Sequence, residues 1–373
     1  MAGIYVHIPF CKKACHYCNF HFSTSPKLQQ AFIVALLKEI QLQKNYLTDP
    51  VSTIYFGGGT PSILAPEEIE AILQSIKNNF SIEANAEITL ETNPDDISPQ
   101  KLDAWKQSGI NRLSIGVQSF SQEDLRWMNR AHNAEQALQS ILLAQQKGFY
   151  NLTIDLIYGT PSLTDEQWKQ NVQQAIALNI PHLSCYALTV EPHTALDKLI
   201  INKKLPPVEN QKQAHHFELL MQWMEDAGYD HYEISNFAKP GHRSRHNSSY
   251  WRGIHYVGLG PSAHSFNGTS RQWNIANNGL YIESLNENLL PFEIEYLTPT
   301  QQLNEYIMTS LRTMEGISFN KVAEDFGKEM AANIFTLAQA HINQQHLADV
   351  NGHLKTTRKG KLLADGIAAD LFQ

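Results

Sequence analysis

The stretch YVHIPFCKKACHYCNFHF, residues 5–22, decides how the rest of the chain is interpreted. It places three of the four cysteines, Cys11, Cys15 and Cys18, directly after a short apolar run typical of a β-strand. Three thiolates do not complete a structural zinc site, which takes four ligands, and they do not form a framework of disulfide pairs. A 4Fe–4S cluster normally takes four cysteines, so a cluster held by three leaves one iron open to another ligand. The triplet therefore predicts an iron–sulfur site with one open iron.

Composition excludes several classes of protein. The chain has 373 residues, 42% of them hydrophobic and 18% charged, with a net charge of −8, so it offers no general attraction for nucleic acid or anionic lipid. The N-terminus lacks the pattern of a signal peptide, and no run approaches the ~20 apolar residues of a membrane-spanning helix. Clustered cysteines without a secretory signal indicate a reducing compartment. We expect a soluble, cytoplasmic protein with no nucleic-acid partner, and leave peripheral membrane contact and a homodimer open.

Strand-like and helix-like segments alternate through the first half of the chain. Strands are predicted at Ile4–Ile8, Thr53–Phe56, Glu87–Leu90, Arg112–Val117, Leu152–Ile157 and Leu183–Leu188. Helices are predicted at Lys27–Tyr46, Pro66–Phe80, Ser98–Ser108, Ala134–Lys147 and Thr164–Leu178. Near-continuous apolar strands between helices favour a parallel sheet with helices outside it. We expect an α/β fold, an open (β/α)6 partial TIM barrel, with a doubly wound sheet as the alternative.

Polar and glycine-rich residues collect where these strands end. Gly57-Gly58-Gly59-Thr60-Pro61 follows the second strand, Glu91-Thr92-Asn93-Pro94 the third and Gln118-Ser119-Phe120 the fourth. Asp155 lies near the end of the fifth. In parallel α/β folds the chemistry sits at the carboxyl ends of the strands, so these residues and the cysteine triplet are expected to share one site.

An iron–sulfur cluster with an open iron can chelate the amino and carboxylate groups of S-adenosylmethionine (SAM), and its reduction by one electron then yields a 5′-deoxyadenosyl radical. Such a site needs backbone donors near the methionine amino end, and the three glycines let the backbone approach a ligand closely. It also needs a carboxylate for the ribose hydroxyls, for which Glu91 is suitable. The strand ends therefore point to SAM as the ligand of the open iron.

The last part of the chain is predicted to differ from the first. Three domains are expected, at 1–237 (the barrel), 238–297 (an irregular connection rich in Gly, Ser, His and aromatic residues) and 298–373. In the last of these, helices precede a hairpin signalled by Asn351-Gly352, which resembles a winged-helix module. Its 7 basic and 8 acidic residues do not provide the basic face that DNA binding requires, so a lid or a partner-docking role is expected.

Several motifs together resemble the radical SAM family of oxygen-independent coproporphyrinogen III oxidases and their relatives, over essentially the whole chain. They are CxxxCxYC, GGGTP, ET-NP, GVQSF, NR and IDLIYGTP. The resemblance implies cluster ligation by Cys11, Cys15 and Cys18, and contact with the cluster-bound SAM by Tyr5, Gly58 and Glu91. Positions that contact a second SAM in the oxidase are occupied here by Tyr17, Gly59, Thr60, Gln118, Arg130 and Asp155. Whether a second SAM binds this chain stays open.

Two departures from the oxidase pattern indicate a different branch. The oxidase has a cysteine two residues after the third cysteine of the triplet, where this chain has Phe20. The stretch HNSSYW, residues 246–251, matches the HNxxYW motif of the heme chaperone (HemW-type) branch, which the oxidase lacks. His246, Tyr250 and Trp251 are therefore expected to contact heme, because imidazole is a common axial ligand and aromatic rings pack on a porphyrin.

Other residues near this motif compete for the same roles. Arg243 and Arg245 are expected to meet heme propionates, while His242, His255 and His264 are alternative iron ligands. Cys185, in the middle of a strand, is expected to be an inert core thiol.

The resemblance implies a heme-binding chaperone that carries a SAM-coordinated 4Fe–4S cluster and delivers heme to acceptor proteins such as membrane respiratory enzymes. Two alternatives from the same scaffold are a coproporphyrinogen III oxidase and a radical SAM methyltransferase.

Overall fold

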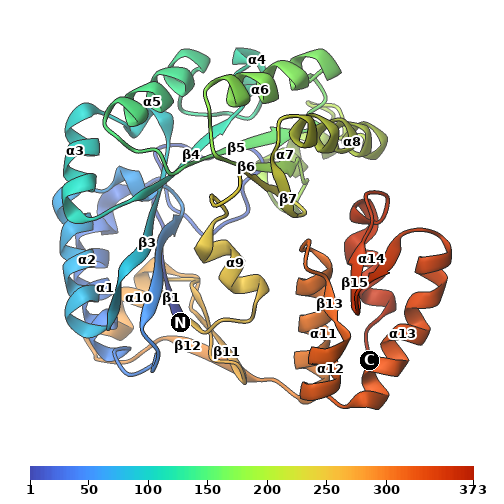
Figure 1. The fold of residues 1–373 in the computed structure, drawn as a ribbon. Coiled ribbons are helices and arrows are strands. Elements are labelled where there is room, and N and C mark those ends of the chain that lie inside the picture. Colours follow the sequence, from blue (N-terminus) through green and yellow to red (C-terminus); the bar gives the residue numbers. More distant parts are fainter.

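Parallel strands in chain order form the centre of the molecule. The computed structural model describes residues 1–373, and its strands β1 to β6 pair with their sequence neighbours in parallel (Figure 1). They are β1 (Ala2–Ile8), β2 (Val51–Gly58), β3 (Ile82–Thr92), β4 (Arg112–Gln118), β5 (Leu152–Tyr158) and β6 (His182–Ala187). β6 does not pair with β1, so the barrel stays open. The predicted open (β/α)6 partial barrel is confirmed.

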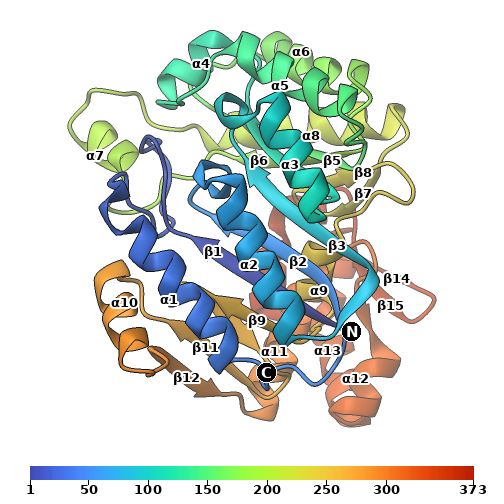
Figure 2. The ribbon, with the colours of Figure 1, turned by 90° about the vertical axis from the view of Figure 1, so that its left-hand side faces the viewer.

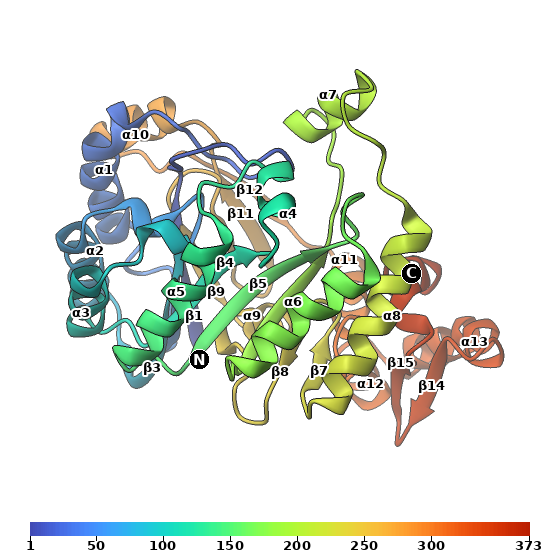
Figure 3. The ribbon, with the colours of Figure 1, turned by 90° about the horizontal axis from the view of Figure 1, so that it is seen from above.

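Helices cover the outer face of this curved sheet (Figure 2). They are α1 (Gln29–Leu42), α2 (Pro66–Asn79), α3 (Pro99–Ser108), α4 (Gln122–Trp127), α5 (Ala134–Gln146), α6 (Asp165–Ala177) and α8 (Asn210–Asp226). The short helix α7 (Ala195–Ile201) lies apart from the sheet (Figure 2 and Figure 3). Local sequence sets their starts: Thr164 and Gln167 form the predicted capping box of α6, and the Ser98 side chain accepts from the Lys101 N–H ahead of α3. Because the strand order follows the chain without reversal, the doubly wound alternative does not apply.

The segment 238–297, which we expected to be irregular, consists mostly of regular elements. It contains the end of the hairpin β7 (Asp230–Glu233) and β8 (Asn236–Ala238), followed by α9 (Arg245–Trp251), β9 (Tyr256–Leu259), β10 (His264–Phe266), β11 (Ser270–Asn274), α10 (Asn278–Asn286) and β12 (Phe292–Tyr296). β9 pairs in parallel with β1, and with β10–β12 on that edge and β8 and β7 on the other the sheet has 12 strands. These strands have 3 to 5 residues, too few for an alternating pattern to stand out.

The C-terminal module has its own core of 12 buried hydrophobic residues, separate from the 52-residue core of the barrel. Its elements are α11 (Pro299–Leu311), β13 (Ile317–Ser318), α12 (Phe319–Asp325), α13 (Lys328–Asn343), β14 (Leu347–Val350), β15 (His353–Thr356) and α14 (Ala364–Asp370). Asn351 and Gly352 form the predicted hairpin turn with φ of 55° and 78°. The helices and three-stranded sheet match the expected winged-helix arrangement.

Two backbone hydrogen bonds join the module to the barrel. The Ile234 N–H donates to the Arg312 carbonyl at 3.0 Å, and the Met314 N–H donates to the Tyr232 carbonyl at 3.1 Å. The module therefore packs beside β7 and α8, on the far side of the molecule from α1 and α10 (Figure 3). None of the helices combines the length and apolar character that crossing a bilayer requires.

Candidate functional site

The loop that carries the three cysteines follows β1, and its two ends are hydrogen-bonded to each other. The Cys11 N–H donates to the Ser23 carbonyl at 3.0 Å, and the Ser23 N–H donates to the Pro9 carbonyl at 2.9 Å. This pairing closes the loop at its base, and Cys11, Cys15 and Cys18 are all partly exposed as free thiols. The loop therefore presents the three sulfur atoms beyond the end of the sheet.

The three thiols line a cavity of about 430 Å³ at the carboxyl ends of the strands. The cavity brings together most of the residues predicted for the site: Cys11, Cys15, Tyr17, Cys18, Gly58, Gly59, Thr60, Glu91, Gln118, Arg130 and Asp155. They come from the cysteine loop, from the ends of β2, β3, β4 and β5, and from the segment after α4. Cys11 and Asp155, which are 144 positions apart in the sequence, thus line the same cavity.

Tyr5 is the exception among the predicted SAM residues, because it does not line this cavity. Its hydroxyl lies 3.2 Å from Nδ1 of His7, and its ring lies beside Gly57, where an added Cβ would come within 2.9 Å of it. Burial raises the pKa of the Tyr5 hydroxyl, and the nearby Glu91 raises it further. In this structure Tyr5 packs against the glycine turn (residues 57–60) outside the cavity.

The glycine turn is packed against the strand that carries the cysteines. Gly58 has a φ of 105°, and a Cβ on Gly59 would come within 2.7 Å of the Phe10 carbonyl oxygen. The N–H groups of Gly59 and Thr60 donate to the carbonyls of Ile8 and Phe10, at 2.9 and 2.8 Å. The expectation that this turn supplies backbone donors is therefore wrong for these two residues. Their own carbonyl oxygens are acceptors, which suit a ligand ammonium group.

Two side chains donate to the cysteine sulfurs. Thr60 Oγ1 donates to Cys11 Sγ at 3.3 Å, and Arg130 Nη1 donates to Cys15 Sγ at 3.2 Å. Burial raises the pKa of the Cys11 thiol to about 11, although the hydrogen bond from Thr60 opposes this. Cys11 is thus protonated at neutral pH, and metal binding would release its proton. Donors aimed at sulfur are what a metal-bound thiolate requires.

The arrangement of the thiols fits a cluster better than a single ion. No group of three or more His, Cys, Asp or Glu side chains converges to hold one metal ion. In a 4Fe–4S cluster each cysteine binds a different iron, so the three sulfurs need not converge on one point. The residues present therefore fit a cluster held by three cysteines.

Two partly buried carboxyl groups, Glu91 and Asp155, line the cavity and interact with each other. Tyr55 OH donates to Glu91 Oε1 at 2.7 Å. Burial raises the pKa of Glu91, the Tyr55 hydrogen bond lowers it and Asp155 raises it, which together give a pKa of about 8. Burial also raises the pKa of Asp155 to about 6. A ligand that donates hydroxyl groups to Glu91 would favour its ionised form.

Arg130 links three parts of the site. Besides Cys15, its Nη2 donates to Asn93 Oδ1 at 2.7 Å and to the Gly116 carbonyl at 2.9 Å, while its buried Nε has no partner. Asn93 also lines the cavity and donates to Thr60 Oγ1 at 3.4 Å. The sequence placed Asn93 at this edge of the sheet but gave it no role in the site. Its position two residues after Glu91, hence on the same side of an extended chain, was the available signal.

The HNSSYW motif lies in α9, on the inner side of the curved sheet (Figure 1). The ring of His246 is 2% exposed and stacks on Tyr55 at a centroid distance of 4.9 Å. Both ring nitrogens are engaged, Nδ1 with Thr53 Oγ1 and Nε2 with Tyr250 OH, each at 2.9 Å. Burial lowers the pKa of His246 to about 3, so the imidazole is neutral. Iron coordination by His246 would require one of these bonds to open.

Trp251, at the other end of α9, faces the C-terminal module. The guanidinium of Arg312 lies 5.5 Å from the Trp251 ring centroid. Trp251 and Arg243 line a cavity of about 230 Å³ that His246 and Tyr250 do not reach. Arg243 is paired with Asp230 and Glu315 and so is not free for a propionate. The structure thus does not bring the predicted heme residues together around one cavity.

The remaining expectations concern single residues. Cys185 is 1% exposed within β6, in agreement with an inert core thiol, and burial raises the pKa of this thiol. Phe20 is 65% exposed at the cavity mouth, where the oxidase pattern has a cysteine.

An open parallel barrel with three thiols and a glycine turn at the carboxyl ends of its strands is the architecture of radical SAM proteins. A model of the radical SAM superfamily matches residues 5–175, and a model of the HemN C-terminal domain matches residues 297–363. The chain is 32% identical to the heme chaperone HemW of Bacillus subtilis (strain 168), over 98% of each chain. It is 37% identical to the heme chaperone HemW of Escherichia coli (strain K12), over 70% of this chain and 69% of that relative. The chain belongs to the HemW family.

Among solved structures, coproporphyrinogen III oxidase (HemN) from Escherichia coli, a radical SAM enzyme, is similar throughout. The match has a TM-score of 0.86 and 25% identity, and covers 100% of this chain and 90% of that chain. The C-terminal module is therefore part of the shared fold.

Proposed function

We propose that this chain is a heme-binding chaperone that carries a SAM-coordinated 4Fe–4S cluster and passes heme to acceptor proteins such as respiratory enzymes. The observation that carries the proposal is the similarity, along nearly the full length, to proteins named as heme chaperones. The HNSSYW helix and the Phe20 position support it, since both depart from the oxidase pattern.

In this proposal the residues of the barrel hold the cluster and SAM. When bound, a cluster with an open iron supplies an electron to SAM. Cys11, Cys15 and Cys18 would ligate the irons, with Thr60 and Arg130 donating to two of the sulfurs. The glycine-turn carbonyls would accept from the SAM ammonium, and Glu91 would accept from the ribose hydroxyls. Asp155, Tyr17 and Gln118 lie on the same cavity, at positions that contact a second SAM in the oxidase, and would contact SAM here as well.

A coproporphyrinogen III oxidase is the second candidate, favoured by the fold shared with HemN. Heme titration and an anaerobic assay with SAM, reductant and coproporphyrinogen III on one cluster-loaded preparation separate the two. We expect stoichiometric heme binding, seen as a Soret band, and no protoporphyrinogen beyond one equivalent. Formation of protoporphyrinogen over many turnovers would reject the chaperone proposal and establish the oxidase.

A further inference from the structure

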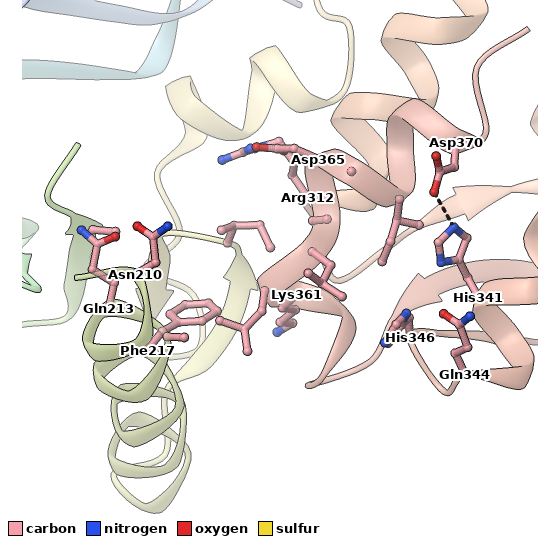
Figure 4. A pocket seen from close by; sticks show the side chains of 18 of the residues that line it. Asn210, Gln213, Phe217, Arg312, His341, Gln344, His346, Lys361, Asp365 and Asp370 are labelled. Atoms are coloured by element: carbon pink, nitrogen blue, oxygen red, sulfur yellow. Dashed lines mark hydrogen bonds and ion pairs between the residues drawn. The ribbon is translucent and has the colours of Figure 1, made fainter. Parts of the chain in front are cut away.

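A cavity of about 690 Å³ lies between α8 and the C-terminal module, and is larger than the cavity at the cysteine loop (Figure 4). Ligand-binding cavities commonly measure about 300–1,000 Å³. Ala187, at the end of β6, lines both cavities, so the two are neighbours. Of the motifs discussed above, only IDLIYGTP reaches its wall, through Tyr158.

Apolar side chains lie on both sides of this inter-module cavity, interspersed with polar ones. Phe217 and Ala214 on α8, with Tyr158 and Ile234, form the barrel side. The module side is formed by Leu362, Leu363, Ala364 and Ile367, of which Leu362 and Leu363 are 36% and 48% exposed. Apolar side chains that face each other across a cavity suit a flat hydrophobic ligand.

A partly buried ammonium group with a weak partner lies on the wall. Lys361 Nζ is 2.8 Å from Nδ1 of His231, whose Nε2 is bonded to the Ile234 carbonyl and therefore carries the ring proton. Nδ1 of His231 is then a neutral acceptor, and Lys361 has no carboxylate within ion-pair distance. Burial lowers the pKa of Lys361 to about 8. A ligand carboxylate would supply the missing counter-charge.

Two imidazoles lie on the module side of the same cavity. His341 Nε2 is held by Asp370 at 3.1 Å, and the rings of His341 and His346 lie 6.0 Å apart (Figure 4). Nδ1 of each ring is buried without a hydrogen-bond partner. His346 differs from His341 in that no neighbouring side chain engages its Nε2. His346 is thus the imidazole that is free to bind a metal centre inside the cavity.

Gly360 allows Lys361 to lie close to the segment that carries His346. A Cβ on Gly360 would come within 1.9 Å of the His346 carbonyl oxygen, so only glycine allows this approach. The Thr357 N–H donates to the same carbonyl at 2.9 Å. This tight turn places Lys361 next to the segment that carries His346.

We propose that the inter-module cavity is the heme seat, with His346 as the axial ligand of the iron and Lys361 as the anchor of a propionate. The inference rests on the proposed heme-chaperone function and assigns the cargo to residues outside the HNSSYW motif. Heme combines a flat apolar ring, a metal that binds imidazole, and carboxylates on one edge, which are the three features that this wall complements. Arg312 lies on the cavity wall and under Trp251, so it connects the heme seat to α9.

The test titrates the cluster-loaded full chain with three probes: ferric heme, metal-free protoporphyrin IX and heme dimethyl ester. His346→Ala should weaken ferric heme binding by about tenfold or more and shift the Soret band, while protoporphyrin IX affinity changes by less than about threefold. Added imidazole should restore the parental spectrum. Lys361→Met should weaken both carboxylate-bearing probes about equally and leave the dimethyl ester unaffected. His353→Ala and Lys355→Met, in the same module but outside this cavity, serve as matched controls and should bind as the parent does.

Thermal unfolding and iron content verify that each variant is folded. Parental heme affinity in both His346→Ala and Lys361→Met would overturn the inference. If the parent binds heme and only His246→Ala loses it, the heme seat is wrong while the chaperone function stands. If the parent binds none of the probes, the proposed function and the inference both fail.

Discussion

The two large cavities of this molecule lie side by side but are built differently. The cavity at the cysteine loop is lined by residues that come from a few contiguous motifs at strand ends. The inter-module cavity is lined by one or a few residues from each of many segments: β5, β6, α8, the turn between β7 and β8, the C-terminal ends of α11 and α13, and the stretch that leads into and forms α14. The first is defined by one barrel, whereas the second exists only because two separately packed cores meet. The comparison teaches that the barrel can hold its cofactor by itself, while the cargo site that we propose depends on the docking of the module.

Removing the cysteines should affect one cavity and spare the other. Replacement of Cys11, Cys15 and Cys18 with alanine is expected to remove all cluster iron, about four atoms per chain, because no other residue can replace the ligands. Heme affinity should change by less than about threefold, since no cysteine of the triplet lines the inter-module cavity. Iron and sulfide analysis and heme titration measure the two effects.

The matched control is Cys185→Ala, which removes the fourth cysteine from the core of β6. It should keep full iron. Retention of iron and sulfide in the triple variant would contradict the ligand assignment, and loss of heme binding there would join the two cavities into one functional unit.

The same contrast explains what the sequence could predict. The barrel was predictable because long apolar strands and capped helices repeat, and because parallel strands place residues such as Glu91 and Asp155 at one edge. The cluster ligands followed from the spacing of three cysteines. Tyr5 was assigned to the SAM cavity but lies beneath the glycine turn, a difference that only side-chain packing determines.

The inter-module cavity could not be predicted. Its wall combines residues from Tyr158 to Asp370, with no two of its charged groups in a recognisable motif. His346 and Lys361 are ordinary residues of a hairpin region in the sequence, and only the docking of two cores gives them a shared cavity. His246 shows the converse. It belongs to a motif that is recognisable in the sequence, but both nitrogens of its ring are engaged by Thr53 and Tyr250.

Alanine substitutions at two histidines should separate a structural imidazole from a ligand. His246→Ala should lower the free energy of unfolding by about 2–4 kcal/mol, because it leaves a buried void and removes the partners of Thr53 and Tyr250. His346→Ala should cost less than about 1 kcal/mol, since its ring is partly exposed and makes no such bonds. Urea unfolding of both proteins without heme measures the difference. Equal destabilisation would remove the contrast on which the two assignments depend.

Glu91, on the wall of the barrel cavity, should make the free energy of unfolding depend on pH. Because the pKa of Glu91 is raised to about 8 in the folded protein, the folded state binds a proton that the unfolded state releases at lower pH. The contribution of Glu91 to stability is then fully present below the ordinary carboxyl pKa and is lost as pH rises through about 8. Relative to Glu91→Gln, the parent without cluster should lose about 1–3 kcal/mol between pH 5 and pH 8.

Urea unfolding of both proteins across this pH range tests the prediction. Other titrating groups such as Asp155 are common to both proteins, so the difference between them isolates Glu91. Parallel pH profiles would show that Glu91 is already ionised in the folded state.

The smallest effect concerns the contact that connects α9 to the wall of the inter-module cavity. The guanidinium of Arg312 over the ring of Trp251 should contribute a coupling energy of about 0.5–1 kcal/mol, as expected for a partly exposed cation–π pair. A double-mutant cycle with Trp251→Leu and Arg312→Met isolates this term from the ion pairs that Arg312 makes with Glu233 and Asp365, because those are lost in both arms. Lys321 over Tyr306, a pair within the module, provides a control cycle.

If module docking shapes the heme seat, Trp251→Leu should also weaken heme binding by about twofold to fivefold, whereas Tyr306→Leu should not. A coupling energy of zero with unchanged heme affinity would mean that α9 and the inter-module cavity act independently, and the HNSSYW motif would then have no route to the proposed heme seat.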